Sequence, residues 1–176
     1  CCAIDMHGTS SSMRLDLNQP HNLGKQFDAI FNLGTAEHVF DVCQVFRSMH
    51  DWLKVGGYAY HHLPMYGEVD HGFYNFHPTF YWDLAHANNY RIVSIAKLTI
   101  KSVQFFNDRD SFSKDIVDQD KTLSYGISAI MEKTIDQPFV KPQQGRYDDY
   151  LAEQSQIIAY WNKQKAISDN PTHKND

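Results

Sequence analysis

The segment from residue 27 to residue 63 constrains the fold of this 176-residue chain more than any other. It begins with the apolar run Phe27–Leu33, which is typical of a buried strand. Over Val39–Leu53 the apolar residues recur at steps of three and four, as in an amphipathic helix. Gly56-Gly57 is expected to stop that helix, and Tyr58–Leu63 is expected to be the next strand. This order predicts two parallel strands joined by a helix.

The rest of the chain predicts more strands and another crossover helix. Pro78 is expected to open a helix that runs to about Asn88, because proline suits the first helical turn. Two long strands are expected at Tyr90–Ile100 and Leu123–Lys133, on either side of a charged segment over Asn107–Lys121 that is either a loop or a short solvated helix. Strands that alternate with helices predict a mostly parallel sheet with helices on its faces. The remaining expected segments are strands at Cys1–Asp5 and Met13–Leu17, a helix over residues 148–165 and a disordered tail over residues 166–176.

Composition limits the expected partners. With 42% hydrophobic residues, the chain can form the core of one domain, expected over residues 1–165. Sixteen basic and 21 acidic residues leave no positive field to attract phosphates, so nucleic acid is not an expected partner. Three cysteines without regular spacing favour a reducing cytoplasm over a disulfide framework. The sequence has no apolar run of about 18 residues, so no membrane partner is expected.

Two motifs carry a resemblance to a known family. They are FDAIFNLGTAEHV at Phe27–Val39 and LKVGG at Leu53–Gly57. With them, the chain resembles the class I S-adenosylmethionine-dependent methyltransferases. The resemblance implies an α/β fold, a Rossmann-like three-layer sandwich with a mostly parallel sheet and an antiparallel closing strand. It also implies S-adenosylmethionine as cofactor and a small molecule as methyl acceptor.

Polar residues follow the expected strands, at the edge where open α/β sheets bind ligands. The resemblance implies that Asp5 binds the cofactor's ribose and that Asp16 and the Leu17 amide bind its adenine. An acid at Asp5 is also common in a loop, and Asp16 also suits a simple turn. The residues that would line the reactive end of the cofactor are Asn32, Leu33, Gly34 and Thr35.

Candidates for catalysis and acceptor binding lie after the core strand and in the aromatic loop over residues 66–76. His38 and His71 are candidate general bases, because imidazole titrates near neutral pH. Glu37 is a candidate acceptor contact, although the helix dipole alone favours an acid there. Tyr74 and Asn75 are further acceptor contacts, in a loop expected to act as a lid. No metal site is predicted, because the histidines of this region lack a known ligand spacing: His61, His62, His71 and His77.

The chain departs from the family pattern in two places. It has no glycine-rich turn for the methionine part of the cofactor, and the stretch from Asp5 to Asp16 is short for a helical crossover. We therefore expect an N-terminally truncated domain. Two alternatives stay open: a non-catalytic methyltransferase-like scaffold that binds a partner, and a Rossmann-type nucleotide enzyme. The latter would need a phosphate-binding glycine turn and a Tyr-x-x-x-Lys pair, and the sequence contains neither.

Overall fold

The structure is a computed structural model that describes residues 2–109 and 124–145. Contacts divide the chain into two compact units, residues 1–142 and residues 143–176, and nearly all of the second lies outside the described residues. The helix expected over 148–165 and the tail expected over 166–176 therefore fall outside the description. The expected domain over residues 1–165 stays a prediction.

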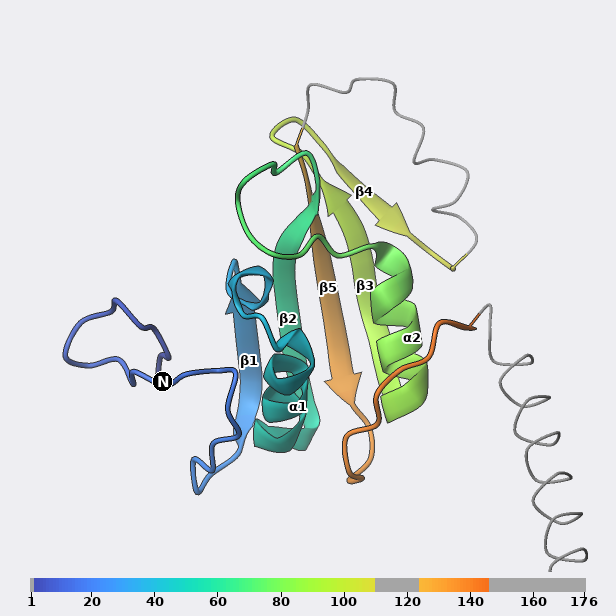
Figure 1. Ribbon diagram of the computed structural model, residues 1–176. Coiled ribbons are helices and arrows are strands. Elements are labelled where there is room, and N and C mark those ends of the chain that lie inside the picture. The colour runs from blue at the N-terminus through green and yellow to red at the C-terminus, as the bar shows by residue number, and fades with distance from the viewer. Residues whose placement is uncertain (1, 110–123, 146–176) are drawn as a thin grey trace, which may run out of the picture. The chain divides into compact units, whose positions relative to one another are not determined.

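Five strands form one mixed sheet in the order β1-β2-β5-β3-β4 (Figure 1). β1 and β2 pair in parallel, β5 lies antiparallel between β2 and β3, and β4 pairs antiparallel with β3. It follows that β1, β2 and β3 all point the same way, and their carboxyl ends meet at one edge of the sheet. The strands are β1 (Phe27–Leu33), β2 (Leu53–Tyr66), β3 (Tyr90–Leu98), β4 (Val103–Phe106) and β5 (Tyr125–Lys133).

The expected Rossmann-like three-layer sandwich with a mostly parallel sheet is wrong. Among the described residues the parallel pairing within the sheet is that of β1 with β2, and the sheet carries two α-helices, α1 (Val42–Trp52) and α2 (Pro78–Asn88). Two features account for the difference. β5 enters the sheet between β2 and β3 and turns both of its pairings antiparallel, and β4, which sequence reasoning missed, adds a further antiparallel edge.

Both helices pack against one face of the sheet. The core cluster joins Phe46 and Met49 of α1 and Tyr81 and Leu84 of α2 to residues of β2, β3 and β5 such as Leu63. On the strands, residues that face this core alternate with residues on the other face. Within the described part of the chain that other face stays open and leaves large apolar side chains exposed: Phe31, Leu33, Tyr58 and Phe105.

The first crossover differs in detail from its expected boundaries. Val39 does not start the helix. A short 3₁₀-helix, η1 (Ala36–His38), follows β1, and α1 begins only at Val42. Asp41 caps α1, because its side chain accepts from the Gln44 amide at 3.1 Å. The expected glycine stop is also wrong. The helix ends at Trp52, and Leu53, which is 1% exposed, already starts β2. Gly56, with φ of 79°, lies instead where the pairing of β1 and β2 shifts register.

The two short N-terminal strands are reduced to one parallel bridge between Ile4 and Met13. Its hydrogen bonds run from the Met13 amide to the Ala3 carbonyl at 2.9 Å and from the Asp5 amide to the Met13 carbonyl at 3.1 Å. The bridge is separate from the five-stranded sheet, so these segments do not enlarge it. Asp5 nevertheless lies at this bridge, and the chain runs on from Met13 to Asp16.

A search of the described residues for a helix long and apolar enough to cross a membrane found none.

Candidate functional site

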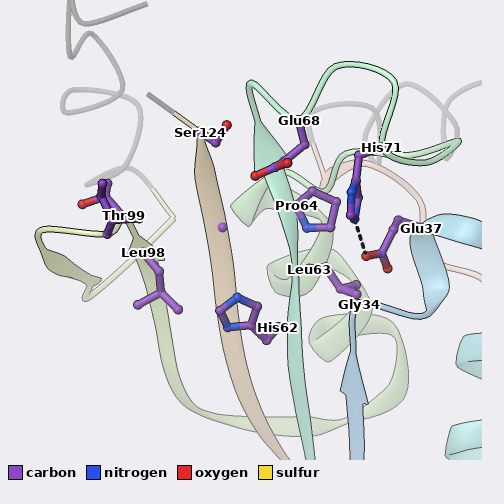
Figure 2. Close-up of a pocket in the computed structure, with 12 residues that line it drawn as sticks. Gly34, Glu37, His62, Leu63, Pro64, Glu68, His71, Leu98, Thr99 and Ser124 are labelled. Carbon is purple, nitrogen blue, oxygen red and sulfur yellow. Dashed lines mark ion pairs between the residues drawn. The ribbon is translucent and has the colours of Figure 1, made fainter. Parts of the chain in front are cut away.

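A pocket of about 390 Å³ lies at the edge where the carboxyl ends of β1, β2 and β3 meet (Figure 2). Gly34 follows β1 and lines one side, with a positive φ of 62° that favours glycine. Leu63 and Pro64 of β2 form the middle, and Leu98 and Thr99 at the end of β3 form the far side. The edge at which the sequence predicts ligand binding therefore carries a pocket.

Glu37 is the most unusual side chain of this pocket. It lies in η1, directly after β1, and is only 1% exposed. Both of its carboxylate oxygens are buried without a hydrogen-bond partner in the structure. A buried carboxylate without donors is costly, because it has lost its water and gained nothing in exchange. Such a group indicates a site whose partner is something other than the folded chain.

Two histidines flank this carboxylate. The Nε2 atoms of His38 and His71 lie 3.8 and 3.6 Å from Glu37 Oε1, too far for hydrogen bonds but within ion-pair range if a ring is protonated. The two rings lie with their centroids 4.9 Å apart. Figure 2 shows His71 pointing from the loop toward Glu37. Each histidine side chain is about half exposed, 47% for His38 and 46% for His71, so both are open to solutes.

The backbone holds the loop after β2 against η1. The Phe73 amide donates to the Glu37 carbonyl at 2.7 Å, and the Phe76 amide donates to the Pro64 carbonyl at 2.8 Å. Gly72 allows this approach, because a Cβ there would lie 2.9 Å from the Glu37 carbonyl oxygen. The loop is therefore fixed next to the carboxylate, and His71 owes its place to these bonds.

Tyr81 of α2 adds a buried hydroxyl to the same region. Its side chain is fully buried, and its hydroxyl has no hydrogen-bond partner in the structure. Burial, and after it the charge of Glu37, raises the pKa of Tyr81 well above its usual range. The hydroxyl thus stays protonated and can donate. The sequence carries no signal that Tyr81 lies near Glu37.

Asn32 stabilises the turn after β1 from the core side. It is buried, its Oδ1 accepts from the Ala36 amide at 3.2 Å, and its Nδ2 lies 3.3 Å from His61 Nδ1. Burial lowers the pKa of His61 to about 3, so this ring is neutral at physiological pH. Asn32 therefore contacts the protein core and positions Glu37, whereas the sequence suggested that it lines the cofactor.

The remaining residues of the same region are spread apart. Leu33 is exposed on the open face of the sheet, and the Thr35 hydroxyl bonds the Leu33 carbonyl at 3.4 Å. The Tyr74 hydroxyl donates to the Phe40 carbonyl at 2.7 Å, which ties the loop down, and Asn75 is exposed. The histidines of the rejected metal pattern separate as well: His61 lies in the core, His62 on the opposite face of β2 and His77 at the start of α2.

The acids expected to bind ribose and adenine lie on the N-terminal segment. Asp5 Oδ1 accepts from the His7 amide at 2.9 Å, and Asp16 Oδ1 accepts from the amide and the side chain of Asn18 at 3.0 and 2.8 Å. These bonds, led by that of the Asn18 side chain, lower the pKa of Asp16. The Asn18 side chain in turn accepts from the Asp41 amide at 2.9 Å, which links this segment to the start of α1.

Comparisons with models of known protein families, with curated proteins and with solved structures found no match. The site is thus defined by its geometry: a pocket at the carboxyl edge, a buried unpaired carboxylate and two half-exposed imidazoles. Sequence reasoning named Glu37, His38 and His71 separately. The structure brings them together, and it adds pocket residues that carried no sequence signal: Glu68, Thr99 and Ser124.

Proposed function

We propose that the chain is an S-adenosylmethionine-dependent methyltransferase that acts on a small-molecule acceptor. The observation that carries this proposal is the position of the pocket. It lies outside the carboxyl ends of three strands that point the same way, and two residues of the motif on which the family resemblance rests, Gly34 and Glu37, line it. Open sheets with parallel strands bind nucleotide-like ligands at this edge. A pocket of about 390 Å³ is large enough for a small molecule.

The N-terminal segment supports a nucleoside end for this site. Asp5 and Asp16 follow the two partners of a parallel bridge, and the hydrogen bond from Asp41 to Asn18 holds Asp16 beside the start of α1. In the proposal Asp5 accepts from the ribose hydroxyls, and Asp16 accepts from the adenine amino group. Asp16 is suited to this role because its hydrogen bonds to the amide and side chain of Asn18 fix its orientation.

The reaction requires alignment above all. S-adenosylmethionine would supply an activated methyl group on sulfur, and Asp5 and Asp16 would hold its nucleoside so that an acceptor in the pocket is aligned with that group. The acceptor's proton would pass to His71, which lines the pocket and is half exposed, or to His38, whose ring centroid lies 4.9 Å from that of His71. The Glu37 carboxylate lies within ion-pair range of both rings, next to the place where positive charge would form.

Calorimetric titration with S-adenosylhomocysteine tests the proposal. We expect saturable binding that weakens about tenfold or more in Asp5→Asn and Asp16→Asn, because each loses a charge-assisted hydrogen bond. Asp28→Asn is the matched control, since Asp28 is an equally exposed acid at the amino end of β1, where it pairs with Lys54 at 2.7 Å. No binding by the wild-type chain would contradict the proposal and favour the alternative, a non-catalytic scaffold.

A further inference from the structure

We propose that Glu37, His38 and His71 bind a divalent transition-metal ion at the rim of the pocket. One ligand atom from each residue can be chosen so that all three lie within 4.8 Å of one another. Glu37 Oε1 is central, at 3.6 Å from His71 Nε2 and 3.8 Å from His38 Nε2. The three residues come from η1 and from the loop after β2, so no sequence spacing could reveal them.

These separations suit a common ion. Zinc lies about 2.0–2.2 Å from nitrogen and oxygen ligands, which places two ligands of a tetrahedral site about 3.3 Å apart. The two separations from Glu37 Oε1 exceed that value by about 0.5 Å or less, and the separation between the two histidine atoms, at most 4.8 Å, exceeds it by up to about 1.5 Å. Small rotations of the two imidazoles close the difference, and both rings are free to make them because each is about half exposed.

The unpaired carboxylate is the second and independent observation. Glu37 is 1% exposed, and neither of its oxygens has a hydrogen-bond partner in the structure. A cation held between this carboxylate and two neutral imidazoles would offset the cost of burying the charge. Two nitrogens and one oxygen are a donor set for zinc and its neighbours in the first transition row; magnesium and calcium prefer oxygen alone.

The surrounding chain prepares this geometry in advance. Glu37 and His38 are consecutive in η1, and the bond from the Phe73 amide to the Glu37 carbonyl, at 2.7 Å, fixes the loop that carries His71. The buried hydroxyl of Tyr81, influenced by the charge of Glu37, is suited to donate to the carboxylate from the core side. Three protein ligands leave at least one coordination position for water or for an oxygen of a bound molecule. With such an ion in place, His38 and His71 would hold the metal through their ring nitrogens and could not also take the acceptor's proton, so a water at the open position would take that role.

Zinc titration of the metal-free chain tests this site. The experiment uses a Cys1→Ser/Cys2→Ser background, because two adjacent thiols can bind zinc by themselves. Calorimetry should show one site, and Co²⁺ should give a visible spectrum without thiolate charge-transfer absorption. Glu37→Gln and His71→Gln should each weaken zinc binding about 100-fold or more, since each removes a ligand.

Two other histidines provide matched controls. His62 lines the same pocket, and His77 is an exposed histidine on the same chain. His62→Gln and His77→Gln should leave zinc affinity within about twofold of the background chain, a free-energy change of only ~0.4 kcal/mol. Circular dichroism checks that every variant is folded; His71 is exposed enough that its replacement should not disturb the fold.

Three results would overturn the metal site. They are the absence of saturable zinc binding, equal affinity in Glu37→Gln and His62→Gln, and an equal loss in all four variants. Cofactor and metal are titrated separately, so a chain that binds zinc but not S-adenosylhomocysteine keeps this inference and loses the methyltransferase proposal. A chain that binds S-adenosylhomocysteine but not zinc keeps the methyltransferase proposal and loses this inference.

Discussion

Two buried charges at opposite edges of the sheet have opposite environments. Lys133, at the end of β5, is 2% exposed, and its ammonium group donates to the carbonyls of His50 and Leu53 at 2.9 and 3.2 Å. Glu37, after β1, is 1% exposed and has no hydrogen-bond partner. The Lys133 ammonium group, which joins β5 to the end of α1, therefore has hydrogen-bond partners, and the Glu37 carboxylate beside the pocket has none. We take Lys133 as structural and Glu37 as functional.

The largest effect is expected from removing the structural charge. Lys133→Met should lower the free energy of unfolding by about 2–3 kcal/mol, because two buried carbonyls lose their donor. Chemical denaturation measures the change. Lys101→Met, at an exposed lysine, is the control and should stay within about 0.5 kcal/mol of wild type. A loss at Lys133 no larger than at Lys101 would show that the buried ammonium group has no structural role.

The next largest effect is expected on the pH dependence of stability, and it comes from His61, which is buried between the two edges of the sheet. Burial lowers its pKa from 6.5 to about 3, so the unfolded chain binds more protons than the folded chain between those pH values. Stability is therefore lost as pH falls below 6.5. Between pH 6.5 and 5.0 the wild type should lose about 1.6 kcal/mol more than His61→Gln, which cannot titrate. Equal pH dependence of the two chains would refute a neutral, buried His61.

Removing the charge of Glu37 should stabilise the fold, whereas removing the charge of Lys133 should destabilise it. In the presence of a chelator, Glu37→Gln should raise the free energy of unfolding by about 1–2 kcal/mol, because an uncompensated buried carboxylate disappears. Glu68→Gln is the matched control, an exposed acid of the same pocket that should change stability little. Destabilisation by Glu37→Gln, of the size expected for Lys133→Met, would show that both charges are structural.

The smallest effect is expected on ligand binding, in which alanine substitutions at two glycines should differ. Gly34 and Gly24 have nearly the same φ, 62° and 64°, so alanine at either should cost about 1 kcal/mol of stability. They differ in their surroundings: a Cβ at Gly34 would lie 3.4 Å from Glu37 Oε1, whereas one at Gly24 would meet nothing within 4 Å. Gly34→Ala alone should weaken ligand binding, as calorimetry would show. Equal binding by both variants would place the ligand away from Gly34.

The sequence predicted the elements whose patterns are local. Phe27–Leu33 and the helix at Pro78–Asn88 have the expected bounds, because an apolar run and a helix-opening proline are visible within each segment. The sheet topology could not be predicted in this way. Whether β5 pairs outside β3 or between β2 and β3 depends on contacts across more than 60 residues, and β4 is only four residues long.

The candidate site shows the same limit. Strand ends predicted the edge at which the pocket lies, and Glu37, His38 and His71 each had a chemical reason to be named. Their convergence depends on Gly72 and on one backbone bond from Phe73 to Glu37, neither of which has a spacing signal. The role of Asn32 was also hidden, because a polar residue at a strand end can face the ligand or the core, and here it faces His61.

The most direct test of the functional edge is a backbone amide NMR titration of the chain with S-adenosylhomocysteine. The account predicts chemical-shift changes at the carboxyl edge, at Gly34, Glu37 and Gly126, and unchanged signals at the opposite edge around Lys133. Changes centred on Lys133, or none at a saturating concentration, would contradict the assignment of the Glu37 edge as the ligand-binding end of this protein.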